Sequence, residues 1–100
     1  MTTYFVTRHQ GALDWARKHG HDDVVALSHL DTEAIEALGP GDAVLGTLPV
    51  NLAADVCARG ASYLHLSINL DAEARGRPLS ADEMELFGAR LERFSITREA

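Results

Sequence analysis

The sequence predicts an α/β fold: a small Rossmann-like three-layer sandwich around a mainly parallel sheet of four strands, formed by residues 1–100 as a single domain. Short apolar runs alternate with segments of helical spacing, and this alternation implies right-handed crossovers between parallel strands. A length of 100 residues suits one domain. The hydrophobic fraction of 46% is ordinary for a globular protein, and neither an internal repeat nor a low-complexity tract interrupts the chain.

The four expected strands carry two kinds of apolar pattern. The segment 3–7 contains an unbroken apolar run, which is typical of a strand buried on both faces. Similar short runs occur at 24–27 and 42–46, whereas 61–68 alternates. The two alternating sets are Leu64, Leu66 and Ile68, and Tyr63, His65 and Ser67. We expect the first strand to be central in the sheet.

The first two expected helices are marked by their ends. The segment Gly11–His19 has apolar residues at helical spacing and is stopped by Gly20. Within it, Trp15 is expected to be core. Asp31 can cap a short second helix, which the turn formers at 39–41 end.

The third and fourth helices carry the clearest terminal signals. Pro49 suits the first turn of a helix, and Gly60 follows the end of the same apolar stripe. A loop is expected at 71–78. Ser80–Glu83 then forms a capping box that opens the last helix. We expect one face of that helix to be core or a dimer surface: Met84, Phe87, Leu91 and Phe94.

Net charge and cysteine usage limit the possible partners. A formal charge of -6 argues against a protein that coats duplex nucleic acid, but it permits a small anionic ligand in one pocket. Cys57 is the single cysteine, which excludes an internal disulfide framework and a cysteine-based zinc site. The chain shows neither the roughly 20-residue apolar run of a membrane span nor a signal-peptide pattern. We therefore expect a cytoplasmic protein with no membrane partner.

The candidate site lies where parallel strands end, because open sheets of this kind bind ligands beyond the carboxyl ends of their strands. The first such segment comprises Thr7, Arg8, His9, Gln10 and Gly11. An arginine fork binds phosphate oxygens, and the free N–H groups of a helix start add to the same positive field. The structural alternative is that Arg8 pairs with a carboxylate and His9 caps the helix.

The second such segment follows the third strand and comprises Gly46, Thr47, Leu48, Pro49 and Asn51. It resembles a phosphate loop in shape but lacks the glycine-rich dinucleotide fingerprint and the Gly-Lys-Thr of a P-loop. Gly46 permits close backbone approach, Thr47 offers a hydroxyl, and Asn51 an amide in the first helical turn. Alternatively, Thr47 simply caps the helix.

The remaining histidines have both structural and functional interpretations. His65 lies on the polar side of its strand and is either a satisfied structural group or a catalytic one. His29, after the second strand, is ambiguous. The segment 19–23 contains two histidines and two aspartates, but its place in a turn favours a solvated loop over a metal cluster. No metal and no cofactor are expected.

Several stretches together are distinctive: 3–9, 11–12 with Trp15, 29–30, 41–42, 46–53, 59–61 and 63–66, above all Gly-Thr-Leu-Pro-Val-Asn at 46–51. They resemble the small csx-type CRISPR-associated accessory proteins found beside type III systems, closely over residues 2 to about 68 and loosely in the last helix. The resemblance implies a Rossmann-like homodimer related to the sensors of cyclic oligoadenylate. It also implies ring-nuclease activity, the cleavage of cyclic tetra-adenylate that switches off type III antiviral signalling.

The chemistry of such a cleavage matches the candidate residues. If a ribose 2′-hydroxyl attacks its neighbouring phosphate, no metal is required, and the protein must hold the geometry and stabilise added negative charge. We expect Arg8 to stabilise that charge and His9 or His65 to act as base or acid. Backbone N–H groups at 47–50, with Asn51, would hold a phosphate or ribose. A two-fold dimer would present each residue twice to a symmetric ring.

Two other functions stay open from the sequence. The same pocket could bind cyclic oligoadenylate without cleaving it, as a sponge or sensor. A histidine-type phosphatase is suggested by a strand running into Arg8 and His9 before Gly11. However, Gln10 interrupts the Arg-His-Gly pattern, and the chain has about half the length that such a domain usually needs.

Overall fold

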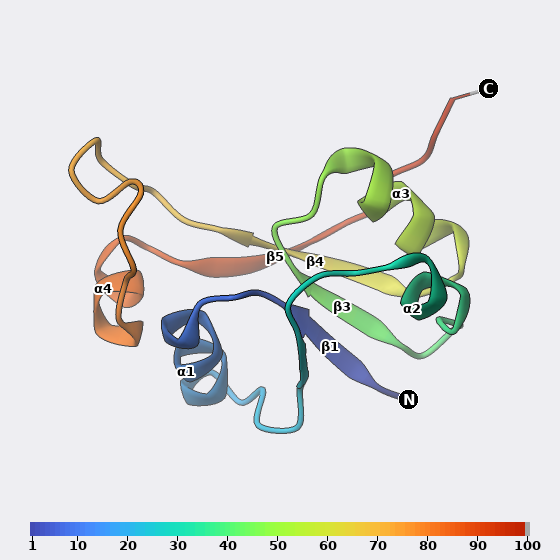
Figure 1. Ribbon diagram of the computed structural model, residues 1–100, viewed down its shortest axis with the longest axis horizontal. Helices are drawn as coiled ribbons and strands as arrows, with labels where there is room; N and C mark the ends of the chain where they lie inside the picture. Colours follow the sequence, from blue (N-terminus) through green and yellow to red (C-terminus); the bar gives the residue numbers. More distant parts are fainter. Residues whose placement is uncertain (100) are drawn as a thin grey trace.

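The computed structural model describes residues 1–99, which form a mixed α/β domain with a five-stranded sheet (Figure 1). The strands are β1 (Thr3–Val6), β2 (Val25–Leu27), β3 (Ala43–Gly46), β4 (Ser62–Ser67) and β5 (Arg90–Phe94). The helices are α1 (Gln10–Lys18), α2 (Thr32–Glu36), α3 (Val50–Ala58) and α4 (Ala81–Leu86). The expected α/β class is confirmed.

The sheet has the order β2-β1-β3-β4-β5, with β1 to β4 parallel and β5 antiparallel to β4. The mainly parallel sheet is therefore confirmed, but the expected count of four strands is wrong. We expected the first strand to be central; β1 is an interior strand of the sheet but not its middle strand. The middle strand is β3, because β5 extends the sheet beyond β4.

The extra strand occupies the second half of the helix expected from residue 80 onward. The capping box at Ser80 is present, but α4 ends at Leu86, and Gly88 has a φ of 73°. The N–H of Gly88 bonds to the carbonyl of Glu85, and that of Ala89 to the carbonyl of Met84, which together make a Schellman motif. This stop signal outweighs the helical spacing of the apolar residues beyond it.

Two separate apolar clusters cover the two faces of the sheet, which makes three layers. One cluster joins α1 and α4 to the strands through Trp15, Met84 and Phe5. The other joins α2 and α3 to the opposite face through Leu38, Val56 and Tyr63. In Figure 1 the helix pairs accordingly lie on opposite sides of the sheet. Trp15 is core as expected, with 2% of its surface exposed.

Polar contacts fix the loops at the start of the sheet. The Asp31 carboxylate accepts a hydrogen bond from Ala34 N–H at 2.8 Å, which confirms the expected helix cap. Asp42 accepts from the N–H groups of Thr2 (2.9 Å) and Gly39 (3.0 Å) and so ties the start of β1 to the turn before β3. No helix within residues 1–99 combines the length and apolar character needed to cross a membrane.

Candidate functional site

A cavity of about 730 Å³ opens at the carboxyl ends of the parallel strands. The chain leaves β1 toward β2 on one side of the sheet and returns to β3 on the other, so the strand order reverses between β1 and β3. Ligands of doubly wound sheets bind at this kind of reversal, and typical ligand pockets have volumes of about 300–1,000 Å³. The position and size of the cavity are those of a small-molecule site.

The cavity lining combines polar and apolar residues. Its polar lining consists of Thr7, Arg8, His9, Ser28, His29, Thr47 and Arg77. Its apolar lining includes Leu30, Leu52, Leu66, Ile68, Leu70, Leu79 and Met84. Among the residues that the structure describes, no aspartate or glutamate lines it, although the chain carries 15 acidic residues. The cavity thus concentrates positive charge in an acidic protein.

Two helices begin at the cavity with N-termini that no side chain caps. The N-cap residues are His9 for α1 and Pro49 for α3, and both line the cavity. The first turn of neither helix contains an acidic residue. His9 thus occupies the expected cap position of α1 but makes no capping hydrogen bond with its side chain. The alternative in which Thr47 caps a helix is wrong, and Pro49 precedes the first turn of α3 instead of lying in it. Uncapped N–H groups leave the partial positive charge of both helix ends available to an anion.

Arg8 is exposed beside these helix ends. No carboxylate pairs with it within residues 1–99, so the structural alternative for Arg8 is also wrong. The hydroxyl of Thr7 accepts a hydrogen bond from His9 N–H at 3.1 Å, a short turn that holds the end of β1. Thr7, Arg8 and His9 lie together at the cavity as the strand-end argument predicts.

Tyr63, on β4, holds the loop after β3 through hydrogen bonds of its hydroxyl group. Its hydroxyl accepts from Leu48 N–H at 3.0 Å and lies 3.2 Å from the Gly46 carbonyl. Burial raises the pKa of the Tyr63 phenol, which favours its neutral form. Thr47 donates its hydroxyl to the Leu66 carbonyl at 3.3 Å. These bonds place Gly46, Thr47, Leu48 and Pro49 along the cavity wall.

Gly46 also has a structural role. A Cβ atom there would lie 2.8 Å from the Val6 carbonyl oxygen, and its φ is 149°. The close approach of β1 and β3 at their carboxyl ends accounts for this glycine.

Four of the predicted site residues lie outside the cavity lining, and two of them belong to β4 and α3. His65 faces Tyr63, with Nδ1 2.7 Å from the phenol oxygen, and packs edge-on against Phe94 at 5.8 Å between ring centroids. Asn51 is exposed on α3, and its carbonyl oxygen accepts from Arg98 at 3.3 Å. The cluster of Arg8, His9, Thr47, Asn51 and His65 expected from the sequence is therefore only partly assembled: the first three line the cavity.

Gln10 and Gly11 likewise do not line the cavity. The Gln10 amide donates to Asp14 at 2.9 Å along α1. A Cβ atom on Gly11 would lie 1.8 Å from the carbonyl oxygen of Leu79. This contact explains the glycine by the packing of α1 against the segment before α4.

Three polar residues of the cavity lining were not among the predicted site residues. Ser28 and His29 follow β2, and their strand-end position was a usable signal; the Ser28 hydroxyl lies 3.1 Å from His29 Nδ1. Arg77 comes from the loop before α4, and no sequence pattern indicates that this loop reaches the same cavity.

The histidines at 19–23 form no metal site. The described residues contain no group of three or more side chains able to hold a metal ion. His19 instead stacks on Trp15 with 4.3 Å between ring centroids and contacts Glu85 at 2.7 Å.

Fold and cavity together define a small α/β domain that has a cavity, lined by arginines, histidines and two helix starts, at the switch point of its sheet. The chain belongs to the family described as "Putative CRISPR-associated protein (Cas_VVA1548)", whose model matches residues 4–97. The CRISPR association implied by the resemblance is thereby confirmed. Neither a curated protein nor a solved structure matches the chain.

Proposed function

We propose that this protein is a ring nuclease that binds cyclic tetra-adenylate in the cavity and cleaves it without a metal ion, so as to switch off type III CRISPR signalling. The observation that carries the proposal is the composition of the cavity lining. Two arginines, two histidines and two uncapped helix starts meet there, with no carboxylate among the described lining residues. Such a surface favours an anion strongly over a cation.

The apolar residues of the cavity lining favour a nucleotide over a simple anion. Leu66, Ile68 and Leu79 contribute apolar surface on which a base can be buried, in the same cavity as the cationic residues. A nucleotide combines the matching features, a flat apolar base and a charged phosphate. An oligoadenylate repeats this pair of features at each step, and membership of a CRISPR-associated family makes a defence signal of this chemistry the natural candidate.

The cleavage needs one base, one acid and charge stabilisation. The 2′-oxygen attacks the adjacent phosphorus, its proton passes to a base, and the bond to the 5′-oxygen breaks as an acid protonates that oxygen. The products are a 2′,3′-cyclic phosphate end and a 5′-hydroxyl end. His9 and His29 are the imidazoles that line the cavity and suit the two proton transfers, while Arg8 suits the extra negative charge. His65 is less suited because it lies outside the lining.

The proposal includes a homodimer. A volume of about 730 Å³ lies within the range of pockets that enclose a drug-sized ligand. A ring of four nucleotides is larger, so one cavity encloses only part of it. Two copies related by a two-fold axis would present matching cavities to a ring that is itself symmetric. Sedimentation with and without the ring measures this directly, and a monomer in both conditions would contradict it.

The experiment is incubation of the purified protein with cyclic tri-, tetra- and hexa-adenylate in excess EDTA, followed by separation of the products. We expect linear fragments ending in a 2′,3′-cyclic phosphate from the tetra-adenylate. Tight binding with an intact ring would instead support the second candidate, a binding module. Neither binding nor cleavage of any ring would refute both.

A further inference from the structure

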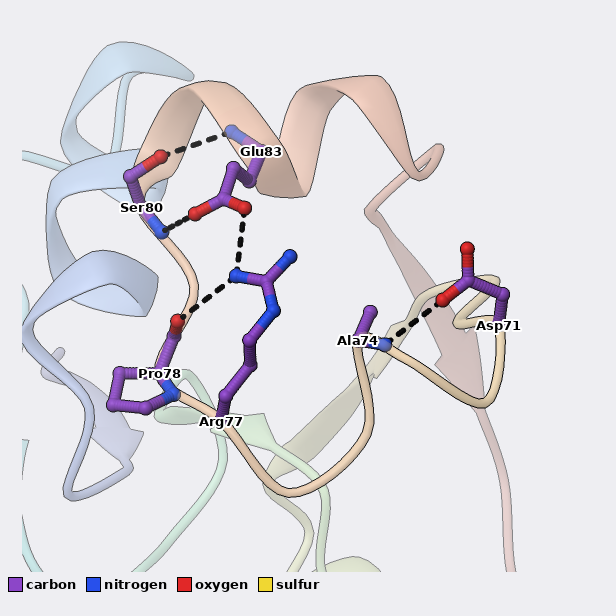
Figure 2. A network of polar contacts seen from close by, with 6 residues as sticks. All are labelled: Asp71, Ala74, Arg77, Pro78, Ser80 and Glu83. Atoms are coloured by element: carbon purple, nitrogen blue, oxygen red, sulfur yellow. Dashed lines mark hydrogen bonds and ion pairs between the residues drawn. The ribbon is translucent and has the colours of Figure 1, made fainter.

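The loop 68–80, which connects β4 to α4, forms one wall of the cavity. Leu70, Ala74, Gly76, Arg77 and Leu79 all line it. The loop has defined internal contacts, shown in Figure 2: the Asp71 carboxylate accepts from Ala74 N–H at 2.8 Å, and Ala74 is buried. Nothing in the sequence patterns associated this segment with a site, and the proposed function counts Arg77 among the lining cations without giving it a role of its own.

Only one nitrogen of the Arg77 guanidinium, Nη1, contacts acceptors in the described part of the protein. Nη1 lies 2.7 Å from a carboxylate oxygen of Glu83 and 3.5 Å from the Pro78 carbonyl. Within residues 1–99 neither Nε nor Nη2 has a protein acceptor, and in Figure 2 Nη2 points away from Glu83. The Arg77 side chain is 47% exposed. The Nε–Nη2 edge is therefore free, and a guanidinium edge is the geometry that binds two oxygens of a phosphate.

We propose that Arg77 is a second phosphate-binding residue of the cavity and that Glu83 positions it. The assignment rests on the proposed function for the identity of the ligand, a cyclic oligoadenylate. Arg8 and Arg77 enter the cavity from different segments, one from the end of β1 and the other from the loop before α4. Adjacent phosphates of one ring can be bound by two cations placed in this way.

Glu83 has two partners, which explains how it can position Arg77. One carboxylate oxygen accepts from Ser80 N–H at 3.2 Å and closes the capping box of α4, and the other binds Arg77. The carboxylate is thus anchored to a helix start before it contacts the arginine. These two hydrogen bonds, with that to Arg77 the larger influence, hold the pKa of Glu83 below its usual value and keep it ionised. Because the anchored carboxylate already holds the Arg77 side chain, Arg77 loses less conformational entropy when it binds a phosphate.

The test measures binding of a cyclic tetra-adenylate whose 2′-hydroxyls are methylated, because this probe cannot be cleaved by 2′-attack. We expect Arg77→Ala to weaken its binding roughly ten- to hundredfold. Arg77→Lys keeps the charge but loses the fork, so it should recover only part of the affinity. Arg75→Ala is the matched control: it removes the same charge from the same loop at a residue that does not line the cavity, and it should bind as the wild type does.

A double-mutant cycle tests the role of Glu83. Glu83→Gln preserves a residue type that can close a capping box, and thermal unfolding verifies that the fold is retained. We expect it to weaken binding in the wild-type background and to have no further effect in the Arg77→Ala background. If Glu83→Gln lowered the affinity equally in both backgrounds, its effect would arise from α4 and not from Arg77, and the positioning role would be overturned.

The outcomes separate the inference from the proposed function. If the wild type binds the ring and Arg77→Ala binds it equally well, Arg77 is not a phosphate-binding residue, and the proposed function stands. If the wild type does not bind the methylated probe and neither binds nor cleaves the unmodified ring, the proposed function fails, and the assignment of Arg77 falls with it.

Discussion

At the scale of single residues, Arg8 is the cavity arginine that no carboxylate of the described residues neutralises, whereas Arg77 is paired with Glu83. Arg8 has no acidic partner within the described chain, whereas Arg17, on the following helix, lies 3.6 Å from Asp14. An unpaired arginine at a cavity contributes little to folding and retains all its donors for a ligand. A substitution of Arg8 should therefore affect ligand binding while leaving the stability of the fold almost unchanged.

We predict that Arg8→Ala abolishes measurable ring cleavage while the protein stays folded. Removal of one charge-stabilising contact typically lowers a rate by ~10²–10³-fold. Single-turnover kinetics measure the loss, and thermal unfolding tests the fold. Arg17→Ala, which changes the charge equally but lies outside the cavity lining, is the control and should cleave normally. A near-wild-type rate for Arg8→Ala would remove this residue from the mechanism.

Tyr63 is the residue through which the sheet supports the cavity wall. We predict that Tyr63→Phe lowers the free energy of unfolding by about 1–3 kcal/mol, because Leu48 N–H loses its acceptor in a half-buried position. Urea denaturation measures the change. Tyr4→Phe is the matched control, since the Tyr4 hydroxyl has no hydrogen-bond partner in the described part of the protein, and it should be near neutral. Equal effects of the two substitutions would contradict this role of Tyr63.

The sequence predicted the site residues at strand ends better than those within elements. Arg8 and Thr47 could be placed together because parallel strands bring their carboxyl ends to one edge of a sheet. His65 could not be placed, since alternation along a strand separates two faces without showing which one borders a cavity. The sequence also could not show whether the Asn51 side chain faces the cavity, because this depends on the direction of α3.

At the scale of elements, the most informative error concerns the segment after Phe87. The apolar residues 84, 87, 91 and 94 have helical spacing, yet 90–94 is a strand. Gly88 was the available signal, because a glycine in the left-handed region ends helices in Schellman motifs. What the sequence could not show was the free edge of β4, whose pairing with 90–94 stabilises the strand.

The contact between α1 and the cavity loop gives a prediction at this scale. We predict that Gly11→Ala destabilises the protein by about 1–3 kcal/mol or more, because the new methyl group would overlap the Leu79 carbonyl at 1.8 Å. Gly39→Ala is the control, since its Cβ would meet nothing within 4 Å. Thermal unfolding compares the two. A stable Gly11→Ala protein would show that the loop is free to move away from α1.

At the scale of the whole molecule, two carboxylates with lowered pKa values each join two segments of the chain, one at the start of the sheet and one at the start of α4. Asp42 is bound by the N–H groups of Thr2 and Gly39, which lower its pKa and join the start of β1 to the α2–β3 turn. Glu83 joins the cavity loop to α4, with Arg77 as the main cause of its lowered pKa. Both groups favour the folded state only while they are ionised.

The sign of the pH dependence follows from these shifts. Because both pKa values are lower in the folded protein, their stabilisation is complete above the ordinary carboxyl range near pH 4 and is lost as the pH falls through the folded values. We predict that Asp42→Asn with Glu83→Gln is less stable than the wild type at pH 7 and that the difference shrinks toward pH 2. Urea midpoints across this range measure it. A difference independent of pH would contradict the prediction.

The burial of Trp15 has a practical consequence for all of these measurements. The indole is the single tryptophan of the chain, and its Nε1 is buried without an acceptor within residues 1–99. A dry indole emits at shorter wavelength than one in water, so unfolding should shift the fluorescence maximum to the red. Since α1 begins at the cavity, this intrinsic fluorophore also offers a label-free optical signal for ligand titrations.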